Sequence, residues 1–391
     1  MNSCLIFKAH KLKNERVVMK TVSVVFSFNN AFCELAAGAI GSLIRHASTQ
    51  YQYDIFIVHD DISIQNQDIL NTLIKKDNIN IRYIKIDFRK FTNENLSYKP
   101  KLTKYTFARL FLHKLFHDIE KILYLDTDII ITSDIAELFN QNLEGHAIGA
   151  CPDLISLWGI KTLKTQKIDT SFLDISNEYN SRYEYLKHYM GLTDSEICSH
   201  FNAGVLLIDL KKAGGGLNSN LPKLLKKRYW NVDQDILNII FKNDKKILDQ
   251  KYNVPASRVS IFINETHELP TIIHFIGTKP TISMCRPMAH YFWEEISSTK
   301  LYYSAIEHFI DKKISDLENK IYNHLDDEKV LTVINHKIRN INRLILRRRY
   351  IRLVIKFLVD SKKYKKLKKN PNKFFLDSKS KFIRLLGKYY N

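Results

Sequence analysis

Short apolar stretches typical of buried strands alternate with helical segments in the first part of the chain. The predicted strands are Thr21–Phe28, Tyr53–His59 and Ile79–Ile86, and the predicted helices between them are Leu35–Ile44 and Asp68–Lys75. This alternation indicates right-handed βαβ units and a mainly parallel sheet. Ligands of such sheets bind beyond the carboxyl ends of the strands, so functional residues are expected at that edge.

The α/β pattern continues beyond this region. We expect a helix at Tyr105–Phe116, strands at Ala147–Ala150, Phe201–Leu210 and Thr271–Phe275, and a helix at Asp233–Phe241. The stretch from Pro152 to His200 is polar, weakly periodic and longer than ordinary connections, which predicts a functional insertion or lid. The fold class expected from the sequence is therefore a large α/β domain with an insertion.

Two aspartates follow an apolar strand that begins at Lys121. Residues two apart on a strand face the same side, so Asp126 and Asp128 can point at one ion. A hard divalent cation held by two carboxylates keeps open positions that phosphate oxygens commonly fill. A solvated strand-to-turn transition explains the same residues, and Asp-x-Asp arises by chance in a chain with 41 acidic residues. The pair alone therefore suggests, without establishing, a metal-bound diphosphate substrate.

Charge is concentrated at the carboxyl-terminal end. The chain of 391 residues has a net charge of +19, yet 19 of its 60 basic residues and only two acidic ones, Asp360 and Asp377, lie at or after Val330. Apolar residues recur there near helical spacing among arginines and lysines. This pattern predicts a basic amphipathic tail, residues 330–391, that binds an anionic membrane surface. A helix docked on the catalytic domain is the alternative, and no nucleic-acid partner is expected because no recognisable binding module accompanies the tail.

The remaining composition favours a cytoplasmic protein at the inner face of the cell membrane. The five cysteines are widely spaced and form no C-x-x-C pair, which argues against a disulfide framework or a cysteine zinc site. The apolar run at the N-terminus is too short for a signal peptide, and no apolar stretch of about 18 residues occurs. Peripheral attachment is therefore expected. Translation could begin at Met1 or at Met19.

Five segments taken together are more specific than any one of them. They are YTFARL from Tyr105, YLDTD from Tyr124, HFNAGVLLIDL from His200, DQDILN from Asp233 and HFIGTKP from His274. Their order and spacing resemble family 8 of the retaining glycosyltransferases, which includes lipopolysaccharide galactosyl- and glucosyltransferases and glycogenin. The resemblance covers about Thr21 to Met284. It implies a GT-A fold with a mainly parallel central sheet.

The resemblance also implies roles for particular residues. Asp126, Asp128 and His274 would bind Mn2+, or Mg2+, beneath the diphosphate of a UDP-sugar, an Asp2His set that suits an octahedral ion. A core histidine is the alternative for His274, and a helix-surface arginine for Arg109. The positions implied to bind the donor are Phe26, Asn29, Arg109, Asp126, Thr127, Asp128, Asn202, Ala203, Asp233, Gln234, His274, Gly277 and Lys279.

The chain departs from the family at two places. The family typically has an acidic residue where this chain has Asn29, whose carbonyl can still accept a hydrogen bond. The family usually has two residues between the glycine and lysine of the last motif, whereas one separates Gly277 from Lys279. We expect altered nucleotide contacts at both places.

Retention of configuration needs either a carboxylate nucleophile or front-side substitution. The position beside the anomeric carbon holds an amide, Gln234, so front-side substitution is favoured, with the Gln234 carbonyl steadying the cationic sugar. Asp233 is the fallback nucleophile, although a helix N-cap also explains it. Asp153 aligns with a position near the acceptor, and a strand-end turn explains it almost as well.

The sequence thus predicts a metal-dependent retaining hexosyltransferase that moves galactose or glucose from a UDP-sugar to lipopolysaccharide or another lipid-linked oligosaccharide. The expected organisation is an N-terminal extension (1–20), a catalytic domain (21–285) with its insertion (152–200), a helical connector (286–329) and the tail (330–391). The rival hypotheses are an inactive binding protein at the membrane and a nucleotidyltransferase. The latter would need a Gly-rich phosphate loop, which FSFNNAF does not offer.

Overall fold

The computed structural model describes residues 19–88, 104–169, 173, 179–277, 279–282 and 287–322. The chain divides into two compact units, one with residues up to Gly277 together with Arg286–Thr299, and one with Thr278–Cys285 and the residues from Lys300 onward. The predicted basic tail and most of the predicted N-terminal extension lie outside the described residues.

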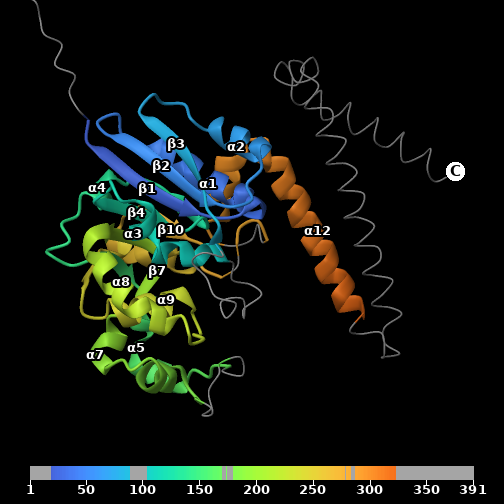
Figure 1. Ribbon diagram of the computed structural model, residues 1–391. Coiled ribbons are helices and arrows are strands. Elements are labelled where there is room, and N and C mark those ends of the chain that lie inside the picture. Colours follow the sequence, from blue (N-terminus) through green and yellow to red (C-terminus); the bar gives the residue numbers. More distant parts are fainter. Residues whose placement is uncertain are drawn as a thin grey trace, which may run out of the picture. The chain divides into compact units, whose positions relative to one another are not determined.

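The first unit is built on a seven-stranded sheet in the order β3-β2-β1-β4-β7-β6-β8. Six strands run in one direction and β7 runs in the other. The predicted α/β class with a mainly parallel central sheet is therefore confirmed (Figure 1). The strands are β1 (Thr21–Ser27), β2 (Gln52–His59), β3 (Ile79–Lys85), β4 (Lys121–Leu125), β6 (Ile148–Pro152), β7 (Phe201–Asp209) and β8 (Lys245–Ile247).

A second, three-stranded sheet has the order β5-β10-β9. Its strands are β5 (Ile129–Ile131), β9 (Val254–Pro255) and β10 (Ile272–His274). Strand β10 pairs antiparallel with β5, with His274 opposite Ile129, and parallel with β9. Because β5 follows β4 after three residues, the chain passes from one sheet to the other at Asp126–Asp128.

Helices complete the first unit. Twelve of the fourteen residues of α1 (Cys33–His46) are buried, since β5 and α11 (Ala289–Ile296) both pack against it. Strand β7 leads into α8 (Leu210–Leu224), which packs against α9 (Asp233–Ile240). The remaining helices and 3-10 turns are η1 (Asn30–Phe32), α2 (Ile64–Asn71), η4 (Lys104–Leu110), α3 (Leu112–Leu115), α4 (Ala136–Phe139), η6 (Gln250–Tyr252), η7 (Ala256–Arg258) and α10 (Val259–Thr266).

Two predicted helices are wrong in detail. The helix expected at Asp68–Lys75 begins at Ile64, because Ser63 accepts the backbone N–H of Asn66 and so caps it. The helix expected at Tyr105–Phe116 is a 3-10 segment followed by one turn of α-helix. Its apolar residues Phe107, Leu110 and Phe111 are buried all the same.

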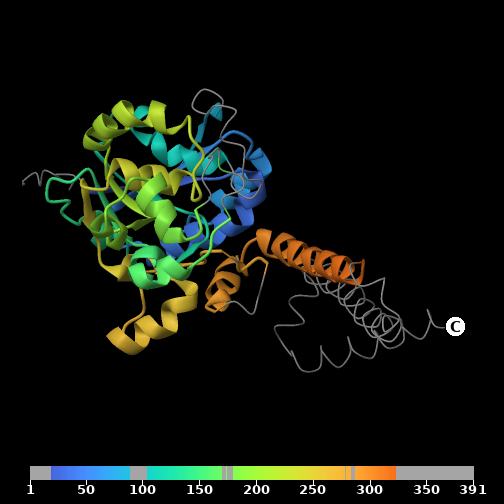
Figure 2. The ribbon, with the colours of Figure 1, turned by 90° about the horizontal axis from the view of Figure 1, so that it is seen from below.

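The predicted insertion contains a small helical layer. It holds α5 (Leu154–Thr165), which is kinked at Gly159, α6 (Arg182–Glu184), the π-helix η5 (Tyr185–Tyr189) and α7 (Asp194–Cys198). These elements enclose a core that includes Ile155, Leu163, Tyr185, Leu186 and Ile197. In Figure 1 α5 and α7 lie at the end of the first unit away from β1–β3, and Figure 2 shows the insertion from below. The stretch that looked weakly periodic therefore has a core of its own.

The region predicted as a connector is divided between the two units. Helix α11 packs on α1, where Phe292 lies against Gly38 and Glu295 pairs with Arg45 at 2.8 Å. Helix α12 (Leu301–Tyr322) belongs to the second unit. The first unit therefore extends beyond the boundary expected at residue 285. Among the described residues, no helix combines the length and the apolar character needed to cross a bilayer.

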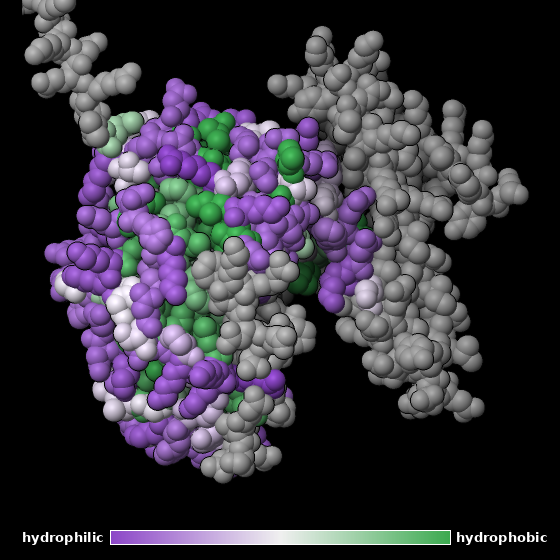
Figure 3. Space-filling model, viewed as in Figure 1, coloured by the Kyte–Doolittle hydropathy of each residue, from purple (hydrophilic) through white to green (hydrophobic). Residues whose placement is uncertain are grey.

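Hydrophilic side chains cover much of the face seen in Figure 3, with hydrophobic residues visible between them. Among the described residues, the exposed large hydrophobic residues are separated in the sequence: Met19, Ile64, Leu157, Ile247, Ile261, Leu269 and Ile282. Singly exposed residues of this kind are normal for a folded surface.

Candidate functional site

The site lies where β4 ends and β7 begins. Because β7 runs antiparallel to β4, its first residues lie at the carboxyl edge of the parallel strands. The backbone N–H of Asp126 donates to the carbonyl of Gly204 at 2.8 Å and fixes this junction. The motifs around Asp126 and His200, about 75 residues apart in sequence, therefore meet at one edge.

The two aspartates come together in a way that strand alternation did not predict. Strand β4 ends at Leu125, and Asp126–Asp128 form the connection to β5 in the second sheet. Asp128 is buried, and the side chain of Asp126 is 23% exposed. The passage between the sheets, rather than one face of a strand, therefore directs both carboxylates toward His274.

Asp126, Asp128 and His274 form a compact group of potential metal ligands. One ligand atom from each residue lies within 4.8 Å of the other two. His274 Nε2 is 3.4 Å from Asp128 Oδ1 and 3.9 Å from Asp126 Oδ2. Oxygen and imidazole ligands suit Mn2+, and carboxylate oxygens suit Mg2+. The residues present thus fit the predicted ion.

A chain of amides orients the histidine. The other ring nitrogen, His274 Nδ1, is 2.9 Å from Asn253 Oδ1, so it carries the proton and leaves Nε2 free to face the carboxylates. Asn253 Nδ2 donates in turn to Asn202 Oδ1 at 2.9 Å. This is the arrangement expected of a metal-binding histidine, and it disfavours the alternative of an ordinary core residue. Asn253 lies outside all five sequence motifs, and no signal in the sequence pointed to it.

Gly204 is a second residue that sequence reasoning missed. A Cβ at this position would collide with His274 Cε1 and lie 2.7 Å from Asp126 Oδ2. Such separations are too short for real side chains, so glycine is what lets β7 approach the ligand group. The signal was present in the sequence, since Gly204 lies within the motif that begins at His200.

Arg109 is held inside the site. It donates to the Ala203 carbonyl, to Asp126 Oδ1 at 2.8 Å and to the Thr106 carbonyl at 3.0 Å. Its Nε lies 3.0 Å from Asp233 Oδ2, and its side chain is 4% exposed. The helix-surface alternative is therefore wrong. The geometry favours an effect on the donor through Asp126, because little of the guanidinium is open to a ligand.

Arg109 is shared between two carboxylates, Asp126 and Asp233. Burial raises the pKa of Asp233 to about 6, an effect that Arg109 only partly offsets. Burial alone would lower the pKa of Arg109, but Asp126 and Asp233 together hold it above its usual range. One guanidinium thus serves two carboxylates, and the carboxylate of Asp128 also raises the pKa of Arg109. A divalent cation bound at the ligand group would add positive charge beside Asp126 and Asp128.

Asp233 and Gln234 open helix α9. The preceding residue, Val232, has a φ of 51°, a strained conformation for a buried β-branched residue. Asp233 does not cap the helix through its side chain, because Val232 occupies the cap position. The N-cap explanation of Asp233 is therefore wrong. Its carboxylate is buried and paired with Arg109, which makes it a weak candidate for a nucleophile.

The amide of Gln234 is fixed at both ends. Its Oε1 accepts from the backbone of Ala203 at 3.1 Å and from Asn202 Nδ2 at 3.2 Å. Its Nε2 donates to Asp153 Oδ2 at 2.9 Å. Both lone pairs of Oε1 are thus in use, so the predicted contact with a cationic sugar requires one of these bonds to be given up. Asp153 caps α5 through Leu154 N at 2.6 Å and is 7% exposed.

The other predicted donor positions are more scattered. Phe26 is fully buried within β1, a core position that gives no support to a donor contact by its side chain. Asn29 follows β1, and its buried Oδ1 has no hydrogen-bond partner among the described residues. Gly277 has a φ of 84°, so the backbone conformation requires glycine there. Thr127 is buried between the two aspartates. Lys279 falls in the second unit, and its diphosphate contact stays a prediction.

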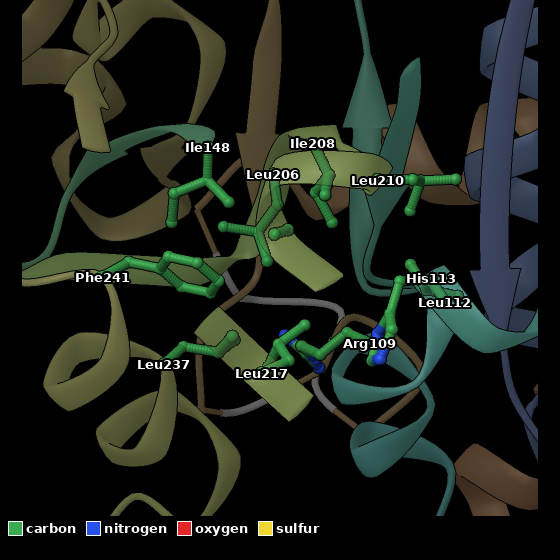
Figure 4. A pocket seen from close by; sticks show the side chains of 11 residues that line it. Arg109, Leu112, His113, Ile148, Leu206, Ile208, Leu210, Leu217, Leu237 and Phe241 are labelled. Carbon is green, nitrogen blue, oxygen red and sulfur yellow. The ribbon is translucent and has the colours of Figure 1, made fainter. Parts of the chain in front are cut away.

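An apolar cavity adjoins Arg109 on β7, α8 and α9. Figure 4 shows Phe241 and Leu237 on one side and Leu112 and His113 on the other. Its lining also includes Ile148, Leu206, Ile208, Leu210, Ala213 and Leu217. An apolar lining does not suit a diphosphate or a sugar, so this cavity belongs to the packing of the core.

Comparison with known proteins identifies a matching family and several relatives. The model of glycosyl transferase family 8 matches residues 23–281. Glycosyltransferase GlyF of Streptococcus pneumoniae is 27% identical over 263 residues, which cover 65% of this chain and 55% of that protein. The lipopolysaccharide 1,2-glucosyltransferase of Escherichia coli is 25% identical over 216 residues, or 51% of this chain and 53% of that enzyme. The aligned regions thus span just over half the length of these two relatives.

Among solved structures, the bifunctional glycosyltransferase WbbM superposes with a TM-score of 0.64 at 23% identity, covering 75% of this chain and 52% of that one. At this level of identity the likeness establishes the fold, which is GT-A. The family model covers well over half of the chain, including every motif at the site. The chain belongs to glycosyltransferase family 8.

Proposed function

We propose that the protein transfers galactose or glucose from a UDP-sugar to a lipid-linked surface glycan such as bacterial lipopolysaccharide, with retention of configuration and with Mn2+ or Mg2+. The observation that carries the proposal is the compact group Asp126, Asp128 and His274, in which one ligand atom from each residue lies within 4.8 Å of the other two. A divalent ion held there would stabilise the charge that develops on the UDP leaving group.

The chain's own residues would bind and align the donor. Asn29 Oδ1, which lacks a protein partner among the described residues, offers an acceptor for an N–H of the uracil base. Arg109 holds Asp126 in place for the diphosphate. Gln234, fixed between Asp153 and β7, would lie beside the sugar. Front-side substitution is favoured, because the amide is a poor nucleophile and Asp233 is engaged with Arg109.

The acceptor and the membrane contact are assigned to the insertion and to the basic tail. The insertion that carries Asp153 would form the acceptor wall and exclude water, which would otherwise hydrolyse the donor. Attachment to the inner leaflet rests on the basic tail, residues 330–391, which lies outside the described residues. One relative acts on lipopolysaccharide by its name, which supports a lipid-linked acceptor.

Calorimetry with UDP, with and without Mn2+, tests the core of the proposal. We expect binding that depends on the ion, and binding unaffected by the ion would overturn the metal site. Release of UDP from a panel of UDP-sugars, with and without lipid-linked acceptors, then tests transfer. Ion-dependent binding with no turnover of any UDP-hexose would favour the inactive binding protein instead.

A further inference from the structure

A buried histidine lies between two buried carboxylates behind Gln234. His200 is fully buried, with Nδ1 3.4 Å from Asp153 Oδ2 and Nε2 4.0 Å from Asp235 Oδ1. Among the described residues, neither ring nitrogen nor Asp235 Oδ1 has a partner that meets hydrogen-bond geometry. Buried polar groups are costly unless they are paired, so this arrangement requires a reason.

The two carboxylates connect the insertion to the candidate site. Asp153 accepts from Gln234 Nε2 at 2.9 Å and caps α5. Asp235 Oδ2 accepts from the hydroxyl of Tyr185 at 2.7 Å and from the backbone of Asn231 at 2.8 Å. His200 is therefore the link between the carboxylate that holds Gln234 and the carboxylate that anchors the π-helix.

Charge balance indicates the state of the histidine. Arg182, whose guanidinium lies 4.0 Å from the centre of the Trp230 ring, is a cation that acts on both Asp153 and Asp235. One guanidinium balances one of these two negative charges. A neutral imidazole would turn an acceptor nitrogen toward one of the carboxylates, whereas the imidazolium has a donor for each. Among the described residues, Asp153 and Asp235 thus face His200, while Arg182 acts on both of these carboxylates and Tyr185 donates to Asp235.

The state of Asp153 determines how Gln234 is turned. Burial favours the protonated acid, yet His200 and Arg182 hold the pKa of Asp153 below its ordinary value. An ionised carboxylate accepts hydrogen bonds and donates none, so it turns the NH2 of Gln234 toward itself. The Oε1 of the amide then faces Ala203 and Asn202, as the structure shows. A protonated Asp153 would remove this preference.

We propose that His200 is a positioning residue that, as an imidazolium bridging Asp153 and Asp235, fixes the orientation of the Gln234 amide. The proposal rests on the glycosyltransferase function proposed above. It assigns a role in turnover to a residue that does not contact the donor, the ion or the acceptor. Loss of His200 is therefore expected to lower kcat without weakening ion-dependent UDP binding.

Three variants test the proposal. His200→Gln removes the positive charge and is expected to lower kcat by about ten- to a hundredfold, with the affinity for UDP and Mn2+ retained. In the double variant His200→Gln/Asp235→Asn, the glutamine can donate to Asp153 and accept from the new asparagine, so part of the lost kcat should return. His146→Gln, at a partly buried histidine whose Nδ1 lies 3.6 Å from Asp244 Oδ1, is the matched control and should leave kcat unchanged.

Nitrogen NMR of the histidine rings gives a readout that needs no activity. The signal that disappears in His200→Gln should show both ring nitrogens protonated at neutral pH in the wild-type protein. A neutral ring, an unchanged kcat in His200→Gln, or no recovery in the double variant would each overturn the proposal. If the wild-type protein binds no UDP with Mn2+, the proposed function fails, and the NMR state of His200 still decides whether the charged bridge exists.

Discussion

The two sides of the candidate site differ in how their charges are balanced. On the strand side, Arg109 pairs with both Asp126 and Asp233, and Asp126 and Asp128 lie beside His274 in the ligand group. On the insertion side, Asp153 and Asp235 lie near Arg182 and His200. The first side presents a group of ligand atoms that suits a divalent ion, whereas the carboxylates of the second side face basic residues of the protein itself. We infer that the strand side binds the ion and the UDP-sugar, and that the insertion side positions the Gln234 amide.

Replacing a ligand on the strand side should give the largest effect. Asp128→Asn removes one of three ligands, so we expect ion-dependent UDP binding to weaken by more than about a hundredfold, as calorimetry can measure. Ion-dependent UDP binding of unchanged strength in Asp128→Asn would contradict the role of Asp128 as a ligand.

The approach of β7 is tested at Gly204. In Gly204→Ala the new methyl group collides with His274 and Asp126, so we expect UDP binding with Mn2+ to weaken by about a hundredfold. Gly215→Ala is the matched control, because a Cβ on Gly215 meets nothing within 4 Å. Equal affinities of the two variants for UDP and Mn2+ would rule out the close approach as a requirement of the site.

The insertion side should respond in stability rather than in binding. Arg182→Met keeps much of the packing on Trp230 but leaves Asp153 and Asp235 with less positive charge. We expect the free energy of unfolding to fall by about 2 kcal/mol, since uncompensated buried charge is costly. Affinity for UDP with Mn2+ should stay close to wild type. A large loss of this affinity would show that the insertion side also contributes to the binding of UDP.

The smallest effect is expected at the amide that orients the histidine ligand. Asn253→Ala removes the acceptor at His274 Nδ1, and we expect affinity for Mn2+, followed by paramagnetic relaxation of water, to fall by about tenfold. Asn253→Asp keeps an acceptor at this position and should restore part of the affinity. Similar losses in both variants would indicate that Asn253 matters for packing rather than for the ring.

The predictable part of the fold follows from local signals. Strands β1, β2 and β3 have nearly the predicted bounds, because runs of β-branched and aromatic residues set them directly. The 3-10 segment at Lys104–Leu110 and the helical layer within 152–200 were not predicted. Both depend on packing against distant elements, which override local periodicity.

The candidate site divides in the same way. The motifs around Asp126, His200, Asp233 and His274 are determined by the sequence, since each is a contiguous run with recognisable spacing. Tertiary structure decided what each residue does there. It set the reversed β7 that brings Gly204 against the ligand group, the amide of Asn253 behind His274, and the internal hydrogen bonds of Gln234. Such roles depend on side chains far apart in the chain, and only the folded protein brings them within hydrogen-bonding distance.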